Sequence, residues 1–219
     1  MNKEIDFNDY KKTTYMVFFA IYFIIDIIIS VFSTNPMRLT FIIQTPMLFI
    51  ALFLFRKLLI NDIKLFKDNK KRYTLFIIIG LVCLMFFNIL GSNISYWILG
   101  DATLPNQEAT EFAFAQTPFL GFFVIAFAAP FLEELMYRRA IKVIIKNKAL
   151  YYIISALLFG FAHITIGFTF PVSFAFIFTH TLVGLCLAFI YDKTKNIWCP
   201  IFIHLLNNGF GAIIMLVSM

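Results

Sequence analysis

The sequence is poor in charge, with Asp, Glu, Lys and Arg making up only 14% of its 219 residues. Hydrophobic residues make up 61%, including 30 Phe. This composition excludes an ordinary soluble domain, because a water-facing helix keeps one polar side. Cysteine is also scarce, and an odd count of three excludes a framework in which every cysteine is paired. We interpret Cys83, Cys186 and Cys199 as packing residues.

Apolar runs of about 20 residues recur along the whole chain, which is the pattern of transmembrane helices. The sequence therefore predicts an all-α, polytopic membrane helical bundle of about seven transmembrane helices. No repeat or low-complexity tract is visible, so we expect a single integral-membrane domain over residues 1–219. The first apolar run lacks a small-residue cleavage pattern, and we expect no removed signal peptide. The predicted spans are roughly Tyr15–Phe32, Thr40–Phe55, Thr74–Leu99, Pro118–Met136, Leu150–Thr165, Pro171–Tyr191 and Trp198–Val217.

The basic residues predict the orientation of these spans. With the N-terminus in the cytoplasm, every Lys and Arg except Arg38 falls on the cytoplasmic face, and a long acidic loop around Glu108 falls opposite. The net charge of +6 is spread over short loops between spans, which argues against a nucleic-acid partner. The expected surroundings are a lipid bilayer.

The stretch Gly121–Arg138 carries two adjacent carboxylates at the end of an apolar run. Ionisable residues at bilayer depth are costly and are functional by default. Glu134 can pair with Arg138 at i+4, which is a sufficient structural reason for its presence. Glu133 is rotated by about 100° on the helix and has no basic residue at i+4, so we interpret it as a reactive group.

Further polar residues interrupt the later spans and the first one: Asp26, His163, His180, His204, Asn207 and Asn208. His180 and Asn207 can be explained by hydrogen bonds across helices, as is common in membranes. His204 and Asn208 are four residues apart and therefore share one helix face. Asp26 has no identifiable partner and stays unexplained.

Helical rise predicts which of these side chains are level. Glu133 and His163 each lie fifteen residues from Lys148 in a basic turn, so both stand about 22 Å along their helices. His180 lies at a similar height above the turn at residues 194–196. His204 stands only about 13 Å along its helix, so meeting the others requires helices that start at different depths.

A carboxylate, two imidazoles and an amide are a set that can hydrolyse an amide bond. The carboxylate accepts a proton from water, an imidazole shares that role, and the other groups donate to the oxyanion. The same set can bind Zn²⁺ through two His and one Glu. The HExxH helix of standard zinc proteases is absent.

Three motifs resemble those of the CaaX protease and bacteriocin-processing (CPBP, or Abi) family of intramembrane proteases. EExxxR reads as Glu133 to Arg138, FxxxH as Phe159 to His163, and HxxxN as His204 to Asn208. The resemblance covers residues 118–219, the half that carries the protease motifs. It implies a bacterial cytoplasmic membrane protein.

By this resemblance Glu133 and His163 would activate water, and His204 and Asn208 would stabilise the oxyanion. The other motif residues would support the site: Glu134, Arg138 and Phe159. A metal, if bound, would be held by Glu133, His163 and His204. The metal-free version is favoured, because Asn208 suits an oxyanion donor better than a metal ligand.

The resemblance implies an endopeptidase that cuts a membrane-embedded or lipid-associated peptide, of the CaaX type or of the bacteriocin and quorum-peptide type. One alternative is a catalytically silent scaffold or immunity protein of the same family. Another is a proton-coupled transporter with Glu133, the histidines and Asp26 as a relay. A transporter would favour inverted repeats, and none is visible.

Overall fold

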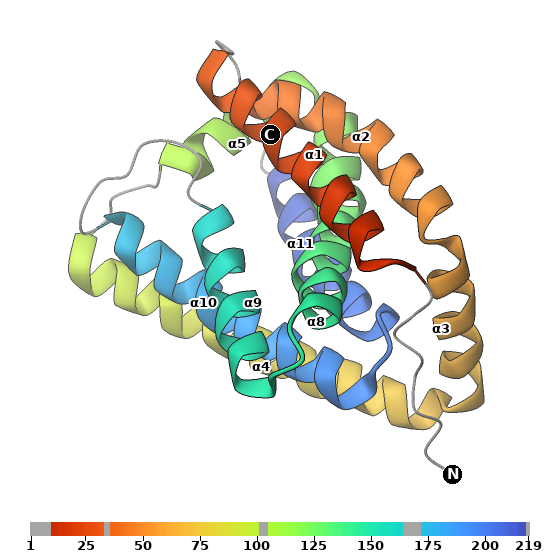
Figure 1. Ribbon diagram of the computed structural model, residues 1–219. Coiled ribbons are helices and arrows are strands. Elements are labelled where there is room, and N and C mark those ends of the chain that lie inside the picture. The colour runs from red at the N-terminus through yellow and green to blue at the C-terminus, as the bar shows by residue number, and fades with distance from the viewer. Residues whose placement is uncertain (1–9, 33–35, 101–104, 164–171, 218–219) are drawn as a thin grey trace.

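The computed structural model describes residues 10–32, 36–100, 105–163 and 172–217, and all regular structure among them is helical (Figure 1). The predicted all-α class is confirmed. The helices are α1 (Lys12–Phe32), α2 (Pro36–Leu54), α3 (Arg56–Asp68), α4 (Lys70–Leu99), α5 (Pro105–Gln116), α6 (Pro118–Phe123), η1 (Val124–Ala128), α7 (Ala129–Glu133), η2 (Glu134–Ala140), α8 (Ile141–Ile144), α9 (Lys148–Ala162), α10 (Val172–Thr194) and α11 (Trp198–Val217).

Each of the seven predicted spans falls on a helix, but not all are long enough to cross a bilayer. Within the described residues, four helical segments are long and apolar enough: Lys70–Ile98, Pro118–Ile144, Ser173–Thr194 and Trp198–Val217. The bent pair α2–α3 can count as a fifth. Lys12–Ile25 and Lys148–Ala162 are apolar but shorter. The chain is an integral membrane protein, while its orientation stays a prediction.

Two helices occupy stretches that the sequence predicts as loops, α3 and α5. The α3 helix is amphipathic, with Leu58, Leu59 and Asp62 buried and basic residues on its outer side. It is bent by 73° from α2 at the buried Phe55. A helix with so many charges gives no membrane-span signal, which is why its sequence resembles a loop. The side chains of Asp26 and Glu108 lie outside the described residues.

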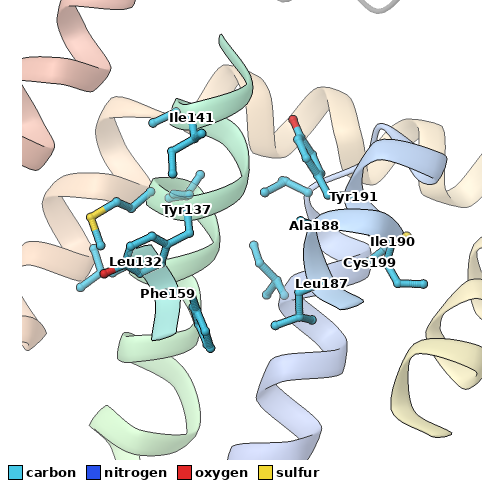
Figure 2. Packing of buried hydrophobic residues seen from close by; sticks show 14 of the residues in the cluster. Leu132, Tyr137, Ile141, Phe159, Leu187, Ala188, Ile190, Tyr191 and Cys199 are labelled. Atoms are coloured by element: carbon cyan, nitrogen blue, oxygen red, sulfur yellow. The ribbon is translucent and has the colours of Figure 1, made fainter. Parts of the chain in front are cut away.

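The centre of the bundle is a continuous helical rod, Pro118–Ile144, built from α6, η1, α7, η2 and α8. We call it the central rod. Figure 1 shows α11 behind it, with α1 and α2 on one side and α9, α10 and α4 on the other. Figure 2 shows part of the core between the central rod and helices α9 and α10. There Leu132 and Tyr137 of the rod face Phe159, Leu187 and Tyr191.

Glycines bring α9 and α10 close together. A Cβ on Gly160 would lie 2.2 Å from Thr181 Oγ1 and 2.9 Å from the Ile177 carbonyl oxygen. A Cβ on Gly184 would lie 3.1 Å from the Ala156 Cα. Small residues at these points allow the two helix backbones to touch, as in other membrane helix pairs.

The two predicted turns are confirmed. The first covers Ile145–Asn147, and the Asn147 side chain caps α9 by accepting a 3.0 Å hydrogen bond from the Leu150 N–H. The second follows Thr194, and the Asn196 side chain donates to the Asp62 carbonyl at 2.6 Å. That bond ties the turn before α11 to α3.

Candidate active site

The paired carboxylates sit where the central rod changes its winding. The α-helical turn α7 ends at Glu133, and the π-helix η2 begins at Glu134. Short π segments are rare inside helices, and many of those that occur lie at functional sites. All residues of η2 are buried, whereas the Glu133 side chain keeps 17% of its surface exposed. The two neighbours therefore have different environments.

Glu134 forms the predicted ion pair with Arg138, and both side chains are completely buried. The guanidinium donates to the two Glu134 oxygens at 2.9 and 3.4 Å. It also donates to Ser155 Oγ at 3.0 Å, and this hydroxyl in turn donates to the Tyr137 carbonyl at 2.7 Å. The pair is therefore linked to α9 through Ser155, a contact that the sequence does not predict.

Glu134 also orients His204. Its Oε1 lies 2.9 Å from His204 Nδ1. A carboxylate paired with Arg138 is ionised and only accepts hydrogen bonds, so Nδ1 carries a proton and donates it. This assignment directs His204 Nε2 toward the site, where it lies 3.9 Å from Glu133 Oε2. The sequence predicts no contact between His204 and Glu134.

Glu133 has a buried carboxylate oxygen without a hydrogen-bond partner. Among the described residues only three buried side-chain atoms share this property, and Oε2 of Glu133 is one of them. Glu134 contrasts with it, because both its oxygens accept hydrogen bonds. Buried polar groups without partners are rare in native proteins and point to function.

Phe159 packs against three of the predicted site residues. Its ring centroid lies 4.5 Å from that of His163, 5.6 Å from that of His204, and 4.7 Å from the Arg138 guanidinium carbon. His163 caps the end of α9, and its Nδ1 lies 2.7 Å from the Phe159 carbonyl oxygen. The ring of His180 stacks on that of His163. The three motif segments thus meet around one phenylalanine.

Asn208 belongs to a chain of amides that sequence analysis largely missed. Asn88 on α4 donates to Asn207 at 2.9 Å, confirming that Asn207 bonds across helices. Asn207 donates to Asn208 at 3.1 Å, and Asn208 donates to the Ile125 carbonyl at 3.3 Å. An amide has two N–H groups, so Asn208 keeps a second donor for a ligand.

The Ile125 carbonyl is available because of a proline. In η1 the hydrogen bonds run from residue i+5, as the Ala129 N–H to the Val124 carbonyl shows. The matching donor for Ile125 is residue 130, and Pro130 has no N–H. Pro130 was the sequence signal that could have located this acceptor.

Residues 115–210 match the family model described as Type II CAAX prenyl endopeptidase Rce1-like. The chain carries an Rce1-like domain. The family predicted from the three motifs is therefore confirmed, and it is a family of membrane proteases. All seven motif residues of the predicted site lie within the matched segment.

Curated relatives of the Rce1-like chain come from bacteria. Membrane-embedded CAAX protease MroQ of Staphylococcus aureus is 30% identical over 69% of this chain and 62% of its own length. UPF0177 protein YvdC of Lactococcus lactis is 35% identical over 64% of this chain and 52% of its own. YdiL of Bacillus subtilis is 28% identical over 68% and 59%. The chain thus spans about half to three fifths of these relatives, and no solved structure matches it significantly.

The possible zinc site of the Rce1-like domain does not fit the side chains as they lie. Within the described residues, no three His, Cys, Asp or Glu side chains come close enough to hold a metal ion. Glu133 Oε2 and His204 Nε2 lie 3.9 Å apart, and the ring of His163 stacks on that of His180.

Proposed function

We propose that this protein is an intramembrane endopeptidase that hydrolyses a peptide bond in a membrane-embedded or lipid-associated peptide. The observation that carries the proposal is the contrast between two adjacent carboxylates. Glu134 is saturated by Arg138 and His204, whereas Glu133 has a free buried oxygen facing His204 Nε2 at 3.9 Å. A free carboxylate oxygen in a shielded site suits a general base.

In this mechanism Glu133 and His163 activate the attacking water. The O–H bond of the water breaks, its proton is shared between the two bases, and its oxygen forms a bond to the scissile carbonyl carbon. The proton then passes to the leaving amine as the C–N bond breaks. Glu134 takes no proton, because its charge is held by Arg138.

The oxyanion would be stabilised by Asn208 and by His204 as an imidazolium, because a ring whose Nδ1 donates to Glu134 can donate from Nε2 only when both nitrogens carry protons. Each is held by a bond on its far side, His204 by Glu134 and Asn208 by the amide chain. Such preorganisation is what makes oxyanion donors effective, and losing one donor typically costs about 10²–10³ in kcat.

The substrate class follows from the surroundings. The site lies in a bundle of apolar helices, so a substrate must reach it through or along the bilayer. The relatives are bacterial, and one carries the name CAAX protease, which supports a CaaX-type or secreted-peptide substrate at the bacterial cytoplasmic membrane. Nucleic acid has no part in the proposed function.

The test compares membrane-bound and secreted peptides of cells carrying the wild type or Glu133→Gln. The swap preserves shape and removes the base. Glu111→Gln, on α5 outside the site, is the matched control. We expect specific products to vanish and longer precursors to accumulate only in Glu133→Gln. Matching profiles, with a deletion phenotype still rescued by Glu133→Gln, would instead identify a silent scaffold.

A further inference from the structure

Three of the candidate membrane spans have an end beside α3. Arg72, at the start of α4, donates to the carbonyl of Lys193, at the end of α10, at 3.2 Å. The α11 helix begins at Trp198, whose Nε1 donates to the Leu59 carbonyl at 2.9 Å. Because α4 and α11 begin here and α10 ends here, the three spans reach the same face of the bilayer. The α3 helix therefore lies at a membrane surface, on the face predicted to be cytoplasmic.

The inner side of α3 is fixed to the bundle. Asp62 is buried, and its Oδ2 accepts a 2.8 Å hydrogen bond from the Ile197 N–H. The Asp62 carbonyl accepts from the Asn196 side chain at 2.6 Å. Leu58 and Leu59 are buried on the same side of the helix. This side is covered by protein, which leaves the outer side of α3 to face the bilayer and its headgroups.

The outer side of α3 and the first turn of α4 concentrate positive charge. Asp68 is the one exposed carboxylate within residues 56–72, all of which the structure describes. Beside Arg72, six basic residues of this stretch are exposed: Arg56, Lys57, Lys64, Lys67, Lys70 and Lys71. Ile60 lies four residues from Arg56 and from Lys64, on the same helix face, and is half exposed. Long basic side chains beside an apolar one are typical of a helix that lies in the membrane interface.

Phosphate headgroups match this surface in charge and in depth. Headgroups lie at the level where membrane spans end, and lysine side chains reach them while their apolar stems stay over the helix. Clusters of about four to eight basic residues next to a membrane span are a pattern with which proteins bind anionic lipids. The bonds on the inner side of α3 hold the surface in place, so little conformational freedom is lost when lipid binds.

We propose that the outer side of α3, together with the first turn of α4, is a binding surface for the phosphate headgroups of anionic phospholipids. The ammonium groups of Lys64 and Lys67 pair with the phosphates, and Ile60 contacts the apolar part of the same lipids. Lipid binding at this surface does not depend on the proposed peptidase activity. It is measured as lipid affinity rather than as cleavage, so either proposal can fail without the other.

Native mass spectrometry of the purified full chain in detergent measures this affinity. Phosphatidylglycerol is the anionic probe, and phosphatidylcholine, which has no net charge, is its control. We expect the wild type to bind phosphatidylglycerol at least about tenfold more tightly than phosphatidylcholine. The preference should fall as the salt concentration is raised, because salt screens exposed charges. Equal affinity for the two lipids would overturn the proposal.

Two matched pairs of substitutions test where the lipid binds. Lys64→Gln/Lys67→Gln removes two exposed charges from α3. Lys146→Gln/Lys148→Gln removes two exposed charges at the same membrane face, since Lys148 pairs with Asp192 near the end of α10 at 3.3 Å. All four side chains are exposed, so we expect both variants to fold like the wild type.

The two pairs should differ in their affinity for phosphatidylglycerol. At roughly fivefold in affinity for each basic residue, we expect the α3 pair to weaken binding by about 25-fold. The pair at the turn before α9 should change it by less than about threefold, and neither pair should change the affinity for phosphatidylcholine. Equal losses in the two pairs, or an unchanged affinity in Lys64→Gln/Lys67→Gln, would refute the assignment of the surface to α3.

Discussion

Arg138 offers the sharpest prediction about stability. Its side chain is completely buried, pairs with Glu134 at 2.9 Å, donates to Ser155 at 3.0 Å and lies 4.7 Å from the Phe159 ring centroid. Arg138→Met keeps much of the volume and removes the charge. The carboxylate of Glu134 is then left buried without its cation.

The expected loss can be worked from these contacts. Removing one partner of a buried ion pair costs about 3–5 kcal/mol. The lost cation–π contact adds about 0.5–2 kcal/mol. For a chain of this size, each kcal/mol lowers Tm by roughly 2–4 °C, so Arg138→Met should lower Tm by roughly 10 °C or more.

Thermal unfolding of the purified protein in detergent measures this loss. The double variant Glu134→Gln/Arg138→Met removes both charges, and we expect it to recover at least half of the lost stability. Arg56→Met, on the exposed start of α3, is the control and should change Tm by less than about 3 °C. A wild-type Tm for Arg138→Met would refute the reasoning about the buried pair.

Two further variants test the packing around the site. Gly160→Val should lower Tm and activity together, because a Cβ would lie 2.2 Å from Thr181 Oγ1; Gly211→Val has open space and should be tolerated. Equal Tm values for the two variants would contradict the close α9–α10 contact. Asn88→Leu removes the donor to Asn207, so we expect a stability loss of about 1–2 kcal/mol in thermal unfolding and a lower kcat at unchanged KM. A kcat and Tm equal to those of the wild type would contradict a role for the Asn88–Asn207 bond in holding Asn208.

The spacing of residues along the sequence predicted those parts of the site that depend on one helix or one turn. Glu134 and Arg138 pair because a separation of four residues places them on one face. The turn residues located the starts of α9 and α11. The three motifs meet around Phe159, in agreement with the family that they predicted.

The missed features depend on relations between helices or on unusual winding. The bond from His204 to Glu134 depends on how deep α11 sits beside the central rod, and residue spacing within one helix does not contain that depth. The Ile125 acceptor exists because η1 is a π-helix that meets Pro130. The sequence analysis missed the α3 helix because its many charged residues lower the hydrophobicity of the segment, although one side of the helix is apolar.

The most direct test of the proposed division between the carboxylates compares Glu133→Gln with Glu134→Gln in the same membranes. Both swaps remove one charge at neighbouring positions, and cleavage of the accumulated precursor and Tm are measured for each. We predict that Glu133→Gln abolishes cleavage at a wild-type Tm, whereas Glu134→Gln lowers Tm because Arg138 and His204 lose their shared partner. Cleavage at the wild-type rate by Glu133→Gln would contradict the assignment of Glu133 as the base.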